Sequence, residues 1–123
     1  MQPNHEDIGK IAFHGYVPNE THDRFERYRS GLGLTSASAL VALLIVREIE
    51  LKRLTSTGWQ NGSDPRTSKV TTYVPTPQAV LFKGHAGGLG RSVSDCVAEL
   101  VEREVEERWL HSALRQQFKE PVL

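Results

Sequence analysis

The residues Tyr16-Val17-Pro18 occur again as Tyr73-Val74-Pro75, 57 positions further along a chain of 123 residues. A second pair of segments, Gly31-Leu32-Gly33 and Gly88-Leu89-Gly90, has the same spacing. The same 57-residue spacing, with no gap, also pairs identical single residues: Phe25 with Phe82, Leu43 with Leu100, and Glu50 with Glu107. A repeat of fixed spacing is the sequence signature of a duplicated structural unit. The chain is therefore expected to contain two copies of one small unit that fold against each other.

Length and composition favour one domain with a shared core. The mass is 13.8 kDa and 38% of the residues are hydrophobic. Each copy has about 45 residues, close to the size below which a domain rarely folds alone without a metal or disulfide. We predict repeats at residues 9–54 and 69–114, a linker at residues 55–68, and tails at residues 1–8 and 115–123. The single cysteine, Cys96, excludes an intrachain disulfide and is expected in the core.

Hydrophobic periodicity predicts a strand and two helices in each copy. Residues 10–17 alternate with the period of a β-strand, and Gly15 falls on the inner side, where a neighbour can approach closely. A short helix to about residue 29 and a longer one to about residue 54 follow. In the second copy, a strand at residues 69–74 and a glycine-rich helix precede a helix that runs from Ser92 to about residue 114.

The charge is balanced in total but unevenly distributed. Fifteen basic and fifteen acidic residues give a net charge of zero. Residues 66–92 include four basic residues and no acidic one, whereas residues 95–107 include six acidic residues and one basic. A neutral total can conceal a basic binding face. The acidic segment from Glu99 to Glu107 is expected to be a solvated helix face.

No membrane segment or secretory signal is recognisable, since the longest apolar run, residues 37–46, is too short to cross a bilayer. A single cysteine suits a reducing compartment. We therefore expect a cytoplasmic protein without membrane partners.

The sequence has the same order of features twice: a strand, a proline, a short helix, a glycine turn and a Ser- or Thr-capped helix. This order resembles the ribbon-helix-helix family. The matching residues are Phe13-His14-Gly15-Tyr16-Val17-Pro18 with Gly33-Leu34-Thr35-Ser36-Ala37-Ser38, and Val70-Thr71-Thr72-Tyr73-Val74-Pro75 with Gly90-Arg91-Ser92-Val93-Ser94-Asp95. The second turn is similar to that of Arc-type repressors. The resemblance implies a mainly α fold with a two-stranded antiparallel β-ribbon, in which two repeats form an intramolecular pseudo-dimer. Tandem copies in one chain are similar to the TraY-type accessory proteins of conjugative plasmids.

The resemblance implies binding to double-stranded DNA, because family members insert the paired strands into the major groove. By alternation, the outward side chains would contact bases: Ala12, His14, Tyr16, Lys69, Thr71 and Tyr73. Helix N-termini and nearby side chains would contact phosphates: Lys10, Thr35, Ser36, Arg66, Arg91, Ser92 and Val93. The two strands differ at the pairs Ala12/Lys69 and His14/Thr71, so an asymmetric DNA site is expected.

The expected processes are DNA transfer, with a relaxase or another DNA-processing protein as partner, and transcriptional repression. The alternative is an antitoxin-like protein-interaction module on the same fold. For single residues, the alternatives are that Tyr16 and Tyr73 pack against the first helix and that His14 has no role. No paired carboxylates, nucleophile–base set, phosphate loop or metal-ligand spacing of histidines is present, so we expect no enzyme, metal or cofactor. The chain is expected to be a monomer that can associate on DNA.

Overall fold

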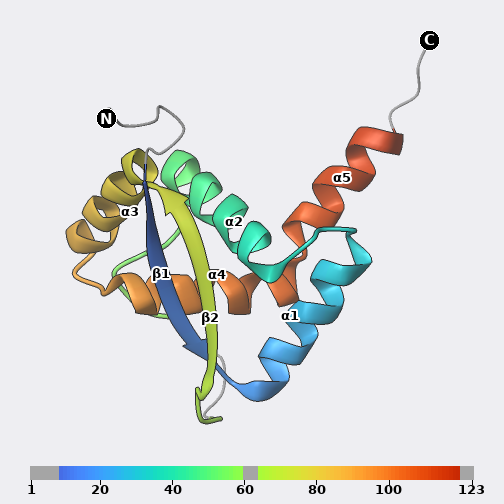
Figure 1. Cartoon of the computed structure of the whole chain (residues 1–123), viewed down its shortest axis with the longest axis horizontal. Coiled ribbons are helices and arrows are strands. Elements are labelled where there is room, and N and C mark those ends of the chain that lie inside the picture. The colour runs from blue at the N-terminus through green and yellow to red at the C-terminus, as the bar shows by residue number, and fades with distance from the viewer. Residues whose placement is uncertain (1–8, 60–63, 120–123) are drawn as a thin grey trace, which may run out of the picture.

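A computed structural model describes residues 9–59 and 64–119. In chain order the elements are β1 (Lys10–Val17), α1 (Asn19–Gly31), α2 (Ala37–Leu51), β2 (Ser68–Pro75), α3 (Thr76–Gly88), α4 (Val93–Glu107) and α5 (Trp109–Lys119). The two strands form one antiparallel sheet with the helices packed around it (Figure 1). The predicted mainly α fold with a two-stranded antiparallel ribbon is confirmed. None of the helices in the described residues is both long enough and apolar enough to cross a membrane.

The two strands pair over their full lengths. Lys10 stands opposite Pro75, His14 opposite Thr71, and Val17 opposite Ser68. Side chains alternate between the two faces of a strand, and the inward ones join the core: Phe13, Val17, Val70 and Val74. The ribbon crosses in front of α4 in Figure 1. One face of the ribbon is thus buried by helices, and the other is left to solvent.

One buried cluster joins both halves of the chain. Phe25 of α1 and Phe82 of α3 are both fully buried, and the ring of Phe82 lies 5.8 Å from that of Phe13. The largest apolar surfaces come from α2 and α4, whose buried residues include Leu40, Val41, Leu44, Ile45, Val97, Leu100 and Val101. Cys96 is fully buried in the same cluster, as predicted.

Two helices end earlier than predicted. α2 stops at Leu51 instead of about residue 54, and the last helix is interrupted at Arg108 instead of continuing to about residue 114. At both points the next residue, Lys52 or Arg108, has a left-handed backbone with φ 52°. Each donates its backbone N–H to the carbonyl oxygen four residues earlier, at 2.8 Å. This is a common way to end a helix.

Each break is explained by a buried glutamate, Glu48 in α2 and Glu104 in α4. The carboxylate of Glu48 accepts the backbone N–H groups of Arg53 and Leu54 at 3.1 and 2.8 Å. The carboxylate of Glu104 accepts the N–H of Leu110 at 2.8 Å. Because the chain after a helix end carries backbone groups without helical partners, each carboxylate replaces a hydrogen bond that a continued helix would have supplied.

The helices α2 and α4 are spaced by 56 residues instead of 57. The Ser36 and Ser92 side chains cap them, each accepting the backbone N–H of the residue three positions later. The turn before α2 is one residue longer than the turn before α4. The gap-free pairing of Leu43 with Leu100 is therefore wrong: Leu43 is 43% exposed, whereas Leu100 is 2% exposed.

Candidate nucleic-acid interface

The six side chains predicted to contact bases share the outward face of the ribbon. The register places them as three opposite pairs: Ala12 with Tyr73, His14 with Thr71, and Tyr16 with Lys69. Tyr16 is 45% exposed and Tyr73 is 55% exposed. The tyrosines are therefore largely free of packing, and the structure brings all six residues together.

The centre of this face is a polar pair. His14 Nδ1 lies 3.0 Å from Thr71 Oγ1, and both side chains are half-buried. Within the described residues, the other ring nitrogen of His14 has no protein partner. An imidazole nitrogen and a threonine hydroxyl can each donate or accept. The centre of the face can therefore hydrogen-bond to more than one kind of base edge.

Two inward contacts fix the ribbon on the helices. A Cβ atom at Gly15 would lie 2.9 Å from the backbone nitrogen of Ala98, so α4 approaches β1 as closely as a glycine allows. On β2, the buried Thr72 donates its hydroxyl to the carbonyl oxygen of Ser38 in α2 at 2.8 Å. Each strand therefore lies against the N-terminal part of one long helix.

The N-termini of α2 and α4 are the candidate phosphate sites. The Ser36 hydroxyl accepts the N–H of Ala39 at 3.1 Å, and the Ser92 hydroxyl accepts that of Asp95 at 3.0 Å. A hydroxyl that accepts in this way keeps its own proton to donate. The free N–H groups and the positive dipole end of a helix also favour anions. The predicted phosphate contacts that lie at these two termini are Thr35, Ser36, Ser92 and Val93.

A groove of about 440 Å³ runs beside β1 and contains a residue that the sequence analysis missed. It is bounded by outward and inward residues of β1, by Val93 and Ser94 of α4, and by Lys83 of α3. Lys83 is exposed. The residue 57 positions earlier is Glu26, which pairs with Arg29. Nothing in the local sequence distinguishes Lys83, because its position depends on how α3 packs.

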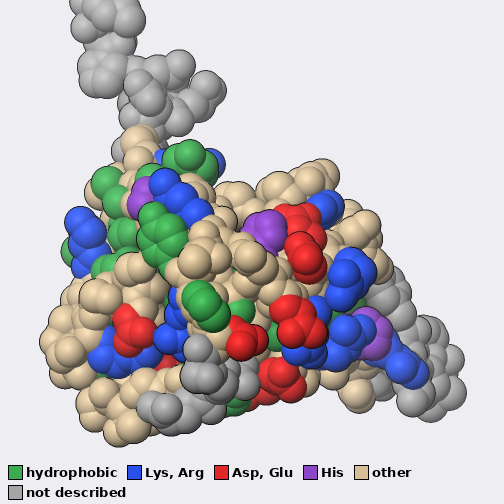
Figure 2. Space-filling view, turned by 90° about the horizontal axis from the view of Figure 1, so that it is seen from below, with side chains coloured by type: hydrophobic (Ala, Val, Ile, Leu, Met, Phe, Trp, Pro, Cys, Tyr) green, Lys and Arg blue, Asp and Glu red, His purple; other side chains and the backbone are tan. Residues whose placement is uncertain are grey.

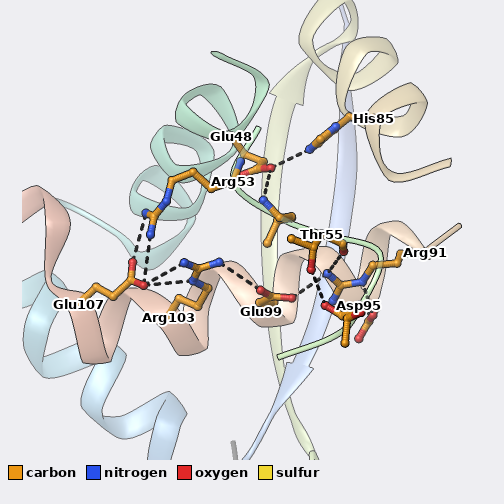
Figure 3. Close-up of polar contacts among 11 residues, drawn as sticks. Glu48, Arg53, Thr55, His85, Arg91, Asp95, Glu99, Arg103 and Glu107 are labelled. Atoms are coloured by element: carbon orange, nitrogen blue, oxygen red, sulfur yellow. Dashed lines mark hydrogen bonds and ion pairs between the residues drawn. The ribbon is translucent and has the colours of Figure 1, made fainter. Parts of the chain in front are cut away.

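Arg66 and Arg91 are held by carboxylates of α4 instead of being free for phosphates. The guanidinium of Arg91 contacts Asp95 at 2.8 Å and Glu99 at 2.7 Å, and its side chain is only 5% exposed (Figure 3). Arg66 donates to both carboxylate oxygens of Glu102, at 3.0 and 3.3 Å. We therefore leave both arginines out of the interface. Lys10, exposed at the start of β1, stays in it.

The acidic segment of α4 is the predicted solvated face only at its end, where Glu106 and Glu107 are exposed. Glu99, Glu102 and Glu104 are 5%, 1% and 1% exposed. Glu99 pairs with Arg91 and Arg103, and Glu102 pairs with Arg66. Figure 3 shows the chain of contacts through Arg103 and Glu107. Burial raises the pKa of Glu107, but hydrogen bonds from Arg53 and Arg103 outweigh it and lower the pKa below its ordinary value.

The outward face of the ribbon has no carboxylate, whereas Asp95 lies in the first turn of α4, beside the Ser92 cap. In Figure 2, hydrophobic, basic and histidine side chains gather at the upper left, on the side of the ribbon. The acidic side chains in that view lie in the upper part right of centre, near the centre and at the lower left. The net charge of zero therefore does not describe the outward face of the ribbon, where the charged residue among the six is Lys69.

Cys96 is expected to be unreactive in the folded protein. Burial raises the pKa of its thiol from 9.0 to about 11, and the thiolate is the reactive form. A chromogenic disulfide reagent at about pH 8 should label Cys96 only after denaturant unfolds the chain. The folded state favours the neutral thiol over the thiolate. The contribution of this preference to the free energy of unfolding is present below about pH 9 and is lost as the pH rises through about 11. Rapid labelling of the native protein would contradict the burial.

Comparison of the chain with protein-family models, with curated proteins and with solved structures finds no match. The candidate interface is therefore defined by its own residues: the outward face of the ribbon, two capped helix N-termini and one flanking lysine.

Proposed function

We propose that this chain binds double-stranded DNA in a sequence-dependent manner, with the β1–β2 ribbon in the major groove. The register of the ribbon carries the proposal. His14 stands opposite Thr71, the residue 57 positions later, and 57 is the spacing of the sequence repeat. A ribbon of two antiparallel strands fits the major groove, where each base pair presents a distinct pattern of donors and acceptors.

The same register supports two ribbon-helix-helix repeats that form a pseudo-dimer within one chain. Lys69 is the repeat counterpart of Ala12, and Tyr73 is that of Tyr16. Ala12 faces Tyr73, and Tyr16 faces Lys69. The repeat counterparts of two facing residues thus also face each other, which is the pattern of a two-fold axis that passes between the central pair. In a homodimer this axis would relate two chains, and here it relates two halves of one chain.

The hydrogen bonds between the two halves of the chain are reciprocal in the same way. Tyr28 of α1 donates its hydroxyl to Glu104 of α4. His85, 57 positions after Tyr28, places its Nε2 2.7 Å from the carboxylate of Glu48 in α2. Each half supplies one partner of each buried pair. Because each half needs the other to complete these pairs, they support our proposal that the chain folds and binds DNA as a monomer.

In this proposal, the outward side chains read the bases. Lys69 can donate to guanine O6 and N7, and the hydroxyl and methyl groups of Thr71 can contact an adenine or a thymine. Phosphates would bind at the capped N-termini of α2 and α4 and at Lys10, which position the protein without reading sequence. Ala12 and Lys69 stand at equivalent positions but have different chemistry, so the two halves of the DNA site should differ.

The substitution Lys83→Gln is expected to weaken binding to all DNA sequences to a similar extent. Lys83 flanks the N-terminus of α4, where a phosphate would lie. The loss of one phosphate contact should reduce the slope of log K against log salt by about 1. Fluorescence anisotropy of a labelled duplex across a salt series measures this slope. The control is Lys52→Asn at the far end of α2, because asparagine tolerates the left-handed backbone there. An equal change in both variants would contradict a specific phosphate contact.

In the cell, the protein would take part in DNA transfer or in transcriptional repression. In DNA transfer it would be a cytoplasmic accessory factor that acts beside a relaxase. The second candidate function is a protein-interaction module on the same fold. A gel shift with plasmid or promoter DNA at low salt separates these candidates. A complex that weakens as salt is added supports DNA binding, and no complex at low salt would favour the protein-interaction module.

A further inference from the structure

A basic cleft lies between α1, the C-terminal end of α4 and the start of α5. It has a volume of about 340 Å³ and is lined by Arg24, Arg27, Tyr28, Gly31, Leu32, Val105, Arg108 and His111. In Figure 1 these elements lie together on the right, apart from the ribbon. The cleft is therefore separate from the proposed DNA interface.

Two of the three arginines that line the cleft have no ion-pair partner among the described residues. Arg24 pairs with Glu106 at 3.2 Å, and both side chains are more than 40% exposed. Arg27 and Arg108 form no ion pair within the described part of the chain, and both are exposed. The guanidinium of Arg108 lies 4.9 Å from the centre of the Tyr28 ring, which holds it beside the cleft. Figure 2 shows basic and histidine side chains gathered on the right of the molecule.

The fold does not require these arginines. The residues 57 positions after Arg24 and Arg27 are Leu81 and Gly84, both exposed on α3. α3 is nevertheless a helix of 13 residues, the same length as α1, and packs against α2 as α1 packs against α4. The two helices therefore have the same structural role with different surfaces. A basic surface on only one of them indicates a binding role instead of a folding role.

The shape of the cleft favours a peptide over a duplex. Leu32 and Val105 give it an apolar wall, and the space beside Gly31 is open, since a Cβ there would meet no atom within 4 Å. A cavity of this size admits a few side chains of a partner chain. We propose that the cleft binds an acidic segment of a partner protein. Carboxylates of that segment pair with Arg27 and Arg108, and an apolar side chain packs against Leu32 and Val105. This inference does not depend on DNA binding by the ribbon.

The test uses the full chain and a fluorescein-labelled peptide with the repeat Glu-Glu-Leu, followed by anisotropy. The double substitution Arg27→Gln with Arg108→Asn should weaken binding roughly tenfold, since two exposed ion pairs with the peptide are lost. Lys52→Asn is the matched control, because Lys52 has the same left-handed backbone at the end of α2. Thermal melting of each variant confirms that it is folded.

Two further probes distinguish the possible ligands. A Lys-Lys-Leu peptide should not bind, and a labelled duplex should bind the wild type and the double variant equally. Loss of acidic-peptide binding in the double variant alone supports the proposal. No binding of the acidic peptide by the wild type, an equal loss in Lys52→Asn, or a matching loss of duplex binding would overturn it, and the last result would assign the cleft to DNA.

Discussion

Replacing Gly15 by alanine is expected to lower the free energy of unfolding by about 3 kcal/mol, near the upper end for overpacking a core. The new Cβ would lie 2.9 Å from the backbone nitrogen of Ala98 and 3.1 Å from the carbonyl oxygen of Ser94. Both atoms belong to the backbone of α4, so relief requires the helix to move away from β1. Urea denaturation followed by circular dichroism measures the change.

The matched control is the same substitution at Gly84, where the expected effect has the opposite sign. Gly84 lies inside α3, and an added Cβ would meet no atom within 4 Å. Alanine should therefore stabilise the helix by about 0.5–1 kcal/mol. If Gly15→Ala were as stable as the wild type, the close packing of α4 against the ribbon would be contradicted.

The double substitution Lys69→Ala with Thr71→Ala is expected to lower the affinity for the preferred DNA site by about 100-fold. Each good base contact contributes about 1–3 kcal/mol of discrimination, and about 2.7 kcal/mol corresponds to this loss. Affinity for unrelated DNA should fall much less, because phosphate contacts supply most of it. Titration of specific and unrelated duplexes at one salt concentration gives both values.

Thr72→Val is the control for this experiment, because Thr72 lies on the same strand but faces inward. Its hydroxyl donates to the carbonyl oxygen of Ser38, so valine should cost about 1 kcal/mol of stability. The ratio of specific to unrelated affinity should remain that of the wild type. If Thr72→Val lost specificity as strongly as the outward double variant, the outward face would not be the reading surface.

The strands and their faces could be predicted from the sequence, since alternation depends on neighbouring residues alone. The period of two in residues 10–17 and 69–74 placed Tyr16 and Tyr73 outward, and both are exposed in the structure. The expectation that Gly15 admits a close neighbour is confirmed by the approach of α4. The first turn of each long helix was predictable for the same reason, because serine caps act within three residues.

Features that depend on distant residues could not be predicted in this way. A run of glutamates in α4 has the pattern of a solvated face, and only the folded chain brings Arg66 and Arg91 onto it. The break at Arg108 depends on the buried Glu104, which also accepts a hydrogen bond from Tyr28, 76 positions earlier. Lys83 reaches the candidate interface through the packing of α3, which no local motif encodes.

Selection of bound sequences from a pool of random duplexes tests the proposed function most directly. The two strands present Ala12 and His14 on one side and Lys69 and Thr71 on the other, whereas the two identical halves of a homodimer read a palindrome. We predict an enriched DNA site whose two halves differ, with enrichment lost in the Lys69→Ala/Thr71→Ala variant. Enrichment of palindromes only, or of no sequence at all, would contradict a ribbon whose two strands read different bases.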